Sequence, residues 1–533
     1  MSGITANRPA ARCLWLLFWL IPMLVACSDG GGGGGGSGLV PPPPAGWQEG
    51  VFVSSENFKN LCADPRTGSF PDQPGTTVDE NNWLRSWSHE LYLWYDEIVD
   101  RNPADYETPE YFDLMKTPET TPSGNPKDQF HFTYPTDVWR ELSQSGISAG
   151  YGATWAIIAR SPPRRVVVAY TEPGSPATSA PANLERGAEI LFVDGADVVN
   201  GGDQASVDTL NAALFPDDAG ETHEFTVRDF GATETRTFTM QSQQITSDPV
   251  QSVKTISTAN GPVGYMLFND HIAPSEAQLI DAVEQLGDAA IVDLIIDVRY
   301  NGGGYLDIAN ELSYMIAGSN ATAGRIFEEM EFNDQHPTVN PVTGRSLDPV
   351  PFHTTAQGFS APEGTPLPSL GLSRVFMLTG SGTCSASESI MNSLRGIDIE
   401  VIQIGSTTCG KPYGFYPADN CGTTYFSIQF RGVNDKGFGD YADGFSPVNV
   451  SQPEGISVPG CSVADDFTHL LGDENEARLA AALQYQGDQT CPAATGFGSQ
   501  RALVTDDTGL GAVRAEVPKS PWLTNRILRR NSP

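Results

Sequence analysis

Four apolar segments in the second half of the chain constrain the fold more than any other feature of the sequence. They read VGYMLF, VDLIID, RVFML and IEVIQIG, and they alternate with helical patterns such as PSEAQLIDAVEQL and LDIANELSYMIAG. Segments this apolar have no face to turn toward water, so they need a sheet that helices cover on both sides. The sequence therefore predicts an α/β core beginning near Pro262.

Shorter strands fill the region before this core, residues 146–244. RRVVVAY reads as a strand, EFTVRDFGATETRTFTM as a strand pair around Gly231, and VDTLNAALF as a short helix. The dipeptide Asp194-Gly195 is the preferred chemistry of a tight hairpin. The order strand, EPGSPA, L-x-x-G-x-x-I-x-x-V-x-G, helix, hairpin resembles a PDZ domain, which implies capture of a peptide C-terminus at a sheet edge. The carboxylate loop of such a domain is expected at Gly150, Tyr151 and Gly152.

Helical patterns dominate residues 50–144. The segment WLRSWSHELYLWY spaces its large apolar side chains three and four residues apart, which places them on one side of a helix. We interpret this stripe as core-facing and assign it no chemistry. Its members are Trp83, Trp87, Leu91, Trp94 and Tyr95.

The N-terminus has the pattern of a targeting segment. Two arginines precede the apolar run LWLLFWLIPMLV, which is short for a membrane span. The run ends in LVAC, which resembles a bacterial lipobox, so Cys27 is the expected lipidation site. An ordinary secretory signal and an uncleaved anchor are the alternatives. Seven glycines and then four prolines follow, a composition typical of a tether that holds a folded body away from a membrane.

Ser28 follows the lipobox cysteine and does not resemble an inner-membrane retention signal. The expected location is therefore the cell envelope of a Gram-negative-type bacterium, lipid-anchored, at the outer membrane or facing the periplasm. The predicted organisation is a signal peptide (1–27), a Gly/Pro-rich linker (28–49), a helical domain (50–144), a PDZ-like domain (145–246), an α/β domain (247–495) and a C-terminal tail (496–533). The polar stretch between Phe327 and Leu370 reads as a surface excursion.

Charge and cysteine content exclude some functions. The net charge is −34, with 65 acidic and 31 basic residues, which argues against binding to nucleic acid phosphates. Six cysteines remain after those of the signal and lipobox, and an even number in an oxidising compartment suggests disulfides whose pairing the sequence does not fix. The cysteines and histidines lack zinc-site spacing, so we expect no metal.

The segment LTGSGTCSASESIMNSLRG carries the first candidate for chemistry. A strand, a glycine-rich turn and a helix place Ser385 at the helix N-terminus, where free amides and the helix dipole stabilise negative charge. A nucleophile there has an amide at hand for the oxyanion of a tetrahedral intermediate. The alternative is an ordinary helix cap, because Ser385 and Glu388 have the spacing of a capping box.

A serine nucleophile needs a base, and IGSTTCGKPYGFYP offers Lys411 in a glycine-flanked turn. A lysine desolvated among small and aromatic residues has a lowered pKa and, when neutral, accepts a proton from serine. A surface lysine is the alternative. Upstream, DVRYNGGG ends an apolar strand with glycines that let backbone amides approach a ligand, unless the loop merely terminates the strand.

Together, SASE after a strand, G-x-x-x-x-G-K with its lysine 26 residues beyond the serine, and D-x-R-x-N-x-G-G resemble the tail-specific, or C-terminal processing, serine peptidases. The resemblance covers residues 146–448, and KDQFHFTY (127–134) is similar to another family segment. It implies a PDZ domain joined to an α/β core of the crotonase/ClpP type. It also implies cleavage of protein substrates with exposed C-termini, without a metal or other cofactor.

The resemblance also implies roles for single residues. Ser385 corresponds to the nucleophile, Lys411 to the general base, and Glu388 to a residue that supports the pair. The oxyanion donors would be the amides of Ala386 and Gly303.

Departures from the family pattern surround this site. Gly302 replaces the usual proline and Phe415 a frequent glutamine, and Pro412 restricts the backbone of the lysine. Cys384 and Cys409 flank the nucleophile and the base; they are bridged to each other, to Cys421, or free, and we favour a bridge between Cys409 and Cys421.

The sequence leaves three functional readings open. The first is an exported serine endopeptidase of the Ser/Lys type that forms an acyl-enzyme. The second is a catalytically weak or inactive envelope protein that binds peptides on the same scaffold, which the departures at Gly302 and Phe415 favour. The third keeps the nucleophile but uses His271 as the base, although a surface position at a strand end is the plainer interpretation of that histidine. The oligomeric state is not predicted.

Overall fold

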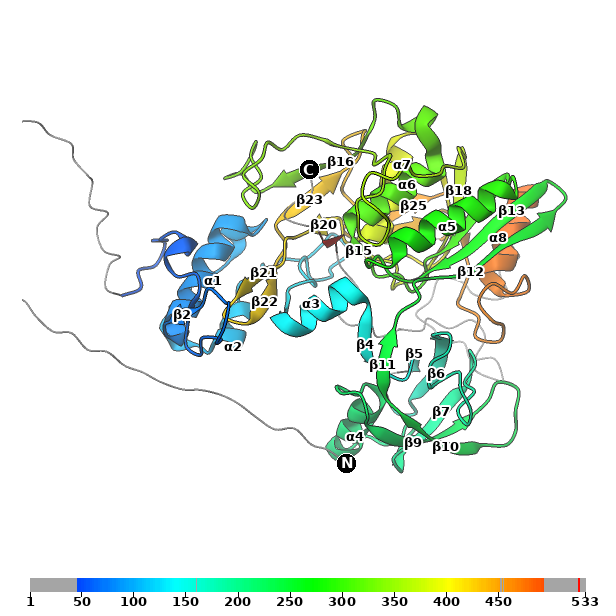
Figure 1. The fold of residues 1–533 in the computed structure, drawn as a ribbon, viewed down its shortest axis with the longest axis horizontal. Helices are drawn as coiled ribbons and strands as arrows, with labels where there is room; N and C mark the ends of the chain where they lie inside the picture. Colours follow the sequence, from blue (N-terminus) through cyan, green and yellow to red (C-terminus); the bar gives the residue numbers. More distant parts are fainter. Residues whose placement is uncertain (1–45, 160, 451–452, 454, 493–525, 528–533) are drawn as a thin grey trace, which may run out of the picture. The chain divides into compact units, whose positions relative to one another are not determined.

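The structure is a computed structural model that describes residues 46–492, except 160, 451, 452 and 454, together with Arg526 and Ile527 (Figure 1). Nearly all described residues belong to one compact unit that begins at Trp47. The predicted lipidation site Cys27, the predicted signal peptide and nearly all of the predicted linker lie outside the described residues, as does most of the C-terminal tail. Among the described residues, none of the helices combines the length and apolar character that a membrane crossing requires.

The N-terminal region is built on helix α1 (Thr77–Leu91), which a capping box between Thr76 and Asp79 starts. Trp83 and Trp87 stack in a buried cluster with their ring centroids 5.1 Å apart, as the helical spacing predicts. The helix ends at Leu91, however, and the extension of the stripe to Trp94 and Tyr95 is wrong. A tertiary contact accounts for the end of the helix, because the amide of Leu93, two residues beyond it, donates to the carbonyl of Ile428. The other elements here are η1 (Ser55–Asn57), β1 (Leu61–Cys62), β2 (Gln73–Pro74), η2 (Tyr95–Glu97), η3 (Pro103–Asp105), α2 (Thr108–Asp113), β3 (Phe132–Pro135) and α3 (Thr136–Ser145).

The second region is a sheet with strand order β10-β9-β7-β6-β5 and one helix, α4 (Gln204–Leu214). Asp194 and Gly195 join β7 to β8 with φ values of 50° and 77°, the left-handed conformations that a tight hairpin turn requires. The predicted strand pair around Gly231 is β9 and β10, which run antiparallel. The strands are β4 (Ile147–Gly150), β5 (Ala153–Ala159), β6 (Arg165–Thr171), β7 (Glu189–Val193), β8 (Ala196–Asp197), β9 (Thr222–Arg228), β10 (Arg236–Gln241) and β11 (Gln243–Thr246), which pairs with β4.

The α/β core contains a six-stranded sheet of order β12-β13-β14-β18-β19-β26, parallel except for β12. Its side chains alternate between two buried clusters. In β14, Leu294 and Ile296 belong to one cluster, whereas Ile295 belongs to the other. Both faces are therefore dry, as the apolar segments predict. The strands are β12 (Val250–Thr258), β13 (Gly261–Phe268), β14 (Asp293–Asp297), β18 (Arg374–Thr379), β19 (Glu400–Gly405) and β26 (Gly460–Ser462).

Helices cover both faces of this sheet (Figure 1). Helices α5 (Ser275–Asp288), α6 (Leu306–Thr322) and α7 (Ala386–Gly396) contribute to one cluster, and α8 (Ala477–Asp488) to the other. The predicted layered α/β core is therefore present, and it leaves the strand ends before α6 and α7 close together.

The stretch between Phe327 and Leu370 is not the surface excursion that its composition suggests. It begins in strand β16 (Ile326–Phe332), which pairs with β17 (Val350–Pro351) and β23 (Phe430–Val433). Phe327, Met330 and Phe352 are buried in the core cluster, so their apolar side chains override the polar average of the segment. The remaining strands are β15 (Gly304–Tyr305), β20 (Tyr413–Gly414), β21 (Ala418–Asn420), β22 (Thr423–Phe426), β24 (Phe445–Pro447), β25 (Ile456–Val458) and β27 (Arg526–Ile527).

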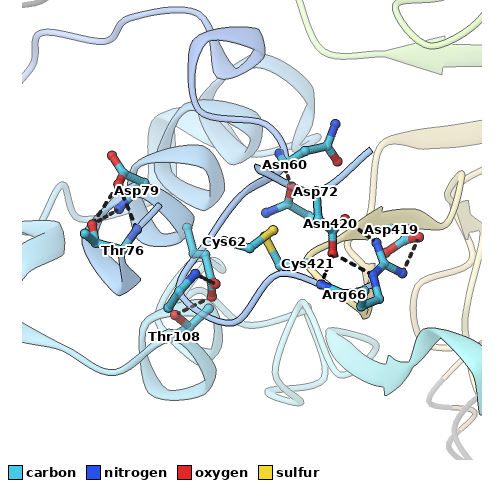
Figure 2. The surroundings of a disulfide bond; sticks show 12 residues. Asn60, Cys62, Arg66, Asp72, Thr76, Asp79, Thr108, Asp419, Asn420 and Cys421 are labelled. Atoms are coloured by element: carbon cyan, nitrogen blue, oxygen red, sulfur yellow. Dashed lines mark hydrogen bonds and ion pairs between the residues drawn. A yellow bond between two sulfur atoms is a disulfide. The ribbon is translucent and has the colours of Figure 1, made fainter. Parts of the chain in front are cut away.

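A disulfide fastens the N-terminal region to the core (Figure 2). Cys62 pairs with Cys421, 359 residues away, in the turn between β21 and β22. Arg66 adds ion pairs to Asp72 and to Asp419 at 2.7 and 3.0 Å. Strand β22 also pairs with β3, so the N-terminal region lies against the segment that follows Lys411.

A buried arginine joins the second region to the core. The Arg186 guanidinium donates to the phenol of Tyr300 at 2.8 Å and to the carboxylate of Asp465 at 2.7 Å. Tyr170 stacks on Tyr300 at 5.8 Å between ring centroids. Tyr300 belongs to the DVRYN segment, so this contact joins the second region to the loop that carries the predicted oxyanion donor Gly303.

Candidate active site

Ser385 lies between β18 and α7 in a conformation that favours chemistry over capping. Its φ and ψ are 58° and −112°, a strained backbone for a residue with a side chain. The residue is fully buried, and its hydroxyl has no hydrogen-bond partner among the described residues. A serine serving as an N-cap would place its hydroxyl oxygen on a helix amide. The Glu388 half of the capping box is present, since its carboxylate accepts from the Ser385 amide, but the cap alternative does not account for the serine hydroxyl.

Glu388 joins the loop of Ser385 to the loop of Lys411. Its Oε2 accepts from the amides of Ser385 and Lys411 at 2.9 and 2.8 Å. Its Oε1 accepts from the Thr408 hydroxyl at 2.6 Å and the Gly410 amide at 2.8 Å. Burial raises the pKa of this carboxyl, and the four donors work in the opposite direction. The carboxylate thus holds the backbones of the two candidate catalytic residues side by side.

Lys411 is fully buried, which excludes the alternative of a surface lysine. Its Nζ lies 4.4 Å from the ring centroid of Phe130 and 4.8 Å from that of Phe415. Burial lowers the pKa of the ammonium group to about 7, against the opposing charges of Asp128 and Glu388. At neutral pH the amine is therefore partly uncharged, which is the state a general base needs.

Sequence reasoning missed two neighbours of the lysine, Asp128 and Phe130. Asp128 is buried and accepts from the Tyr92 hydroxyl at 2.7 Å and the Phe130 amide at 2.8 Å. Both residues belong to KDQFHFTY, the segment similar to the family outside the core. The resemblance was the only signal for them, because they lie nearly 300 residues before the lysine.

The charged residues of the DVRYN segment have a structural role. Arg299 is fully buried and forms paired hydrogen bonds with Asp297, at 2.9 and 2.8 Å, and with Glu476, at 2.7 and 2.8 Å. It also reaches Asp465 at 2.8 Å. These contacts fix the loop that carries the following glycines.

Asn301 connects that loop to the nucleophile segment. Its carbonyl accepts from the amide of Cys384 and the hydroxyl of Ser387, both at 3.0 Å. Its side-chain oxygen accepts from the Gly303 amide at 3.0 Å. The Gly303 amide is thus engaged within the loop, whereas Ala386 supplies the first amide of α7 beside Ser385. The oxyanion roles of both amides stay predictions.

His271 is fully buried, so the interpretation as a surface residue is wrong. Its Nδ1 lies 3.0 Å from Oδ1 of Asn301, and its backbone joins the glycine loop through the carbonyl of Gly303. The described contacts place it in the support of that loop.

The cysteines pair differently from our expectation. Cys409 is bonded to Cys384, not to Cys421, and the third disulfide joins Cys461 to Cys491. Cys421 forms its disulfide with Cys62, and no local sequence pattern indicates that these two cysteines lie side by side. Ligand atoms of Cys384, Glu388 and Cys409 lie within 4.8 Å of one another, but sulfurs joined in a disulfide offer no thiolate to a metal.

The predicted peptide-binding residues connect β4 to β5, with Gly150 at the end of β4 and Tyr151 and Gly152 between the two strands. Tyr151 is buried, and its hydroxyl donates to the carbonyl of Ala213 at 3.0 Å. Gly152 has φ +72°, and a Cβ there would lie 2.3 Å from the Cβ of Ser175, so only glycine fits. The conformation is that of a tight loop, and its role in binding stays a prediction.

Comparison with known proteins agrees with this geometry. Residues 262–414 match the model of peptidase family S41. None of the curated proteins matches the chain. Among solved structures, a candidate S41 protease from Bacteroides fragilis NCTC 9343 is similar at 20% identity and a TM-score of 0.56, covering 80% of this chain and 100% of that one.

Two further structures are more remote. The photosystem II D1 C-terminal processing protease has 19% identity and a TM-score of 0.41, over 72% of this chain and 94% of that one. Mature CPAF complexed with lactacystin has 14% identity and a TM-score of 0.35, over 70% and 92%.

Residues 262–414 thus carry a match to peptidase family S41, which supports a serine peptidase. The predicted resemblance to the tail-specific proteases is confirmed for this segment.

Proposed function

We propose that the chain is a serine endopeptidase in which Ser385 is the nucleophile and Lys411 the general base. The observation that carries the proposal is a buried serine hydroxyl, without a hydrogen-bond partner among the described residues, on a backbone that shares one carboxylate with that of a buried lysine whose pKa lies near 7. Glu388 is a positioning residue, since it bonds the backbones of both. A protein that only held peptides would have no use for a buried, partly neutral lysine, so binding without catalysis is the less favoured function.

In the proposed reaction, Nζ of Lys411 takes the proton from Oγ of Ser385 as Oγ attacks the carbonyl carbon of the scissile bond. The Ala386 amide donates a hydrogen bond to the resulting oxyanion. The Gly303 amide donates to it as well, after giving up its hydrogen bond to the side chain of Asn301. The C–N bond then breaks, and the amine leaves with the proton from Lys411. Water attacks the acyl-enzyme in the same manner, returns the hydroxyl to Ser385 and releases the new carboxyl group.

The finer parts of the proposal concern substrate choice and location. The region from 145 to 246 would bind exposed C-termini of protein substrates at Gly150, Tyr151 and Gly152, as in a PDZ domain. The N-terminal sequence supports export and lipidation at Cys27, which would anchor the enzyme in the cell envelope.

The test uses the compact unit from Trp47 onward and an unstructured reporter protein with an apolar C-terminus. Wild type is expected to cleave the reporter, and Ser385→Ala and Lys411→Met are expected to leave it intact. We expect cleavage although Phe415 stands where many family members have a glutamine. The ring of Phe415 helps to bury Lys411, and burial keeps the amine partly uncharged.

Two outcomes would redirect the assignment. Cleavage that survives Lys411→Met but not His271→Ala would transfer the role of base to His271. Binding of the reporter without cleavage by wild type would favour the peptide-binding function.

A further inference from the structure

The C-terminal tail returns to the candidate active site as a strand. Strand β27 (Arg526–Ile527) pairs in parallel with β15, with Gly304 opposite Arg526 and Tyr305 opposite Ile527. In Figure 1 it is the short dark red arrow beside the labels of β15 and β20. The backbone of the tail is thus attached to a segment more than 200 residues earlier in the chain.

Only one edge of strand β15 can pair with a further strand. On its other side Gly304 forms a parallel bridge with His271, and the Tyr305 amide donates to the His271 carbonyl at 2.8 Å. β27 takes the remaining edge. An edge with free backbone groups beside a reacting centre is the usual place for an extended peptide, which adds to the sheet as a further strand.

The position of this edge relates it to both candidate catalytic loops. β15 begins directly after Gly303, the predicted oxyanion donor. β20 begins two residues after Lys411, and β27 packs against β20 as well as β15. Arg526 and Ile527 therefore lie against the segments that follow the predicted oxyanion donor and the proposed general base, where the backbone of a substrate would have to lie.

Charge favours the same partner. The last thirteen residues, PWLTNRILRRNSP, contain three arginines and no acidic residue, in a chain of net charge −34. The Tyr413 phenol of β20 interacts electrostatically with Arg431 and, more weakly, with Asp440, Asp128 and Asp443, so the charges there are mixed. A basic segment is attracted to a chain with this net charge.

We propose that the chain's own C-terminal segment occupies, through Arg526 and Ile527, the strand edge of β15 that holds substrate peptides, and competes with them in cis. This inference rests on the proposed function, because only a peptidase would bind substrate at this edge. Binding of the C-terminal segment to the edge of β15 can itself be measured without catalysis.

The binding test uses the full chain with Ser385→Ala, so that no cleavage intervenes, and the same protein ending at Ser520. A fluorescein-labelled peptide of residues 521–533 is titrated with each and followed by anisotropy. The shortened protein is expected to bind the peptide roughly tenfold more tightly than the full chain, because a tethered tail competes at millimolar effective concentration. Equal binding by both proteins, or by neither, would overturn the inference.

Peptide variants show where binding occurs. Arg526→Pro with Ile527→Pro removes both amides of β27 and is expected to abolish binding, whereas Arg526→Ala with Ile527→Ala keeps the amides and is expected to retain most of it. A peptide amidated at its C-terminus should bind as well as the free acid. Loss of binding on amidation would place the peptide at a carboxylate loop such as Gly150–Gly152 and contradict the inference.

Kinetics separate this inference from the proposed function. With active protein, the chain ending at Ser520 is expected to have a roughly tenfold lower KM for the reporter and an unchanged kcat, and added peptide should raise the KM again. If wild type cleaves nothing while the peptide binds as expected, the proposed function fails and tail occupancy stands. If cleavage is normal and the KM is unaffected by truncation, only the tail inference fails.

Discussion

The backbone amides of Ser385 and Lys411 donate to the same oxygen atom, Oε2 of Glu388. The two residues follow different strands of the parallel sheet, β18 and β19, whose ends lie side by side. One buried carboxylate thus sets the spacing between the proposed nucleophile and the proposed base through their backbone amides. Support of this kind fixes the backbones from which the two side chains project.

Activity should depend on pH through Lys411. Because burial lowers its pKa to about 7, kcat/KM is expected to rise with pH and to reach half of its upper limit near pH 7. Rates of reporter cleavage between pH 5 and 9 measure this. A profile that is flat across this range would contradict the assignment of the base.

Lys411→Met should abolish cleavage and stabilise the protein. A depressed pKa means that the unfolded chain binds more protons between about 7 and 10.5, so the lysine's contribution to stability is lost as pH falls through 7. At about 1.4 kcal/mol per pKa unit, the variant gains on the order of 5 kcal/mol at pH 6, and the gain vanishes near pH 10.5. Urea unfolding at pH 6, 8 and 10 measures it. Lys436→Met, at an exposed ion pair with Asp398, is the control and should show no such gain.

The neighbours of the lysine should shift its titration in opposite directions. Asp128→Asn removes a carboxylate that raises the pKa of Lys411, so the midpoint of the pH–rate profile should fall below 7. Phe130→Ala opens the ammonium group to water, so the midpoint should rise. Asp137→Asn, an exposed aspartate in α3, should leave the midpoint unchanged. Shifts of the same sign in the two test variants would show that burial and charge do not set this pKa.

The comparison of sequence and structure shows which features local patterns carry. The alternation of Leu294, Ile295 and Ile296 between two buried faces follows from composition alone, and the turn at Asp194-Gly195 follows from backbone preference. Ser385 and Lys411 were found because each sits in a short motif at a strand end. In all these cases the information lies within a few residues.

Features that depend on distant contacts were missed. The partner of Cys421 is 359 residues away, and Phe130, which helps to bury Lys411 as predicted, comes from another region. Helix α1 ends at Leu91 because Leu93 bonds to Ile428, although the apolar spacing continues. Such contacts are set by the packing of whole regions, which leaves no periodic signal in the chain.

The disulfide between Cys384 and Cys409 should matter for turnover as well as for stability. Replacing both cysteines by alanine opens a link across 25 residues and is expected to cost roughly 3 kcal/mol of unfolding free energy. Because the cysteines adjoin Ser385 and the loop of Lys411, kcat should also fall roughly tenfold, since small misplacements of reacting groups slow catalysis. Urea unfolding and reporter kinetics measure the two effects.

The third disulfide provides a matched control for this pair. Cys461 and Cys491 are 30 residues apart, so their replacement should cost a similar free energy of unfolding. They adjoin neither candidate catalytic loop, so kcat should stay unchanged. The same loss of kcat in both double variants would mean that general destabilisation, and not the placement of Ser385, is responsible.

Two carboxyl groups hold the segment before Leu367 against the core, and they predict a second dependence on pH. Glu276 accepts four backbone amides, and Glu311 accepts one at 2.8 Å. Burial, followed by the charge of Glu276, raises the pKa of Glu311 to about 9, with a smaller contribution from Asp307. A hydrogen bond with the Glu276 carboxyl group also raises the pKa of Glu311. The four amides belong to Gln357, Gly358, Ser360 and Ala361.

A raised pKa gives stability that is complete below the unfolded value of about 4.5 and is lost as pH rises through 9. Glu311→Gln keeps a donor toward Glu276 and removes the titration. Its unfolding free energy should therefore change less than that of wild type between pH 5 and 9, and the variant should be the more stable protein at pH 9. Urea unfolding gives the free energies, and hydrogen exchange of residues 357–361 locates the effect. Glu284 is exposed on the same helix as Glu276, so Glu284→Gln is the control and should show the same pH dependence of unfolding free energy as wild type. If Glu311→Gln also shows the wild-type pH dependence, Glu311 is ionised in the folded chain.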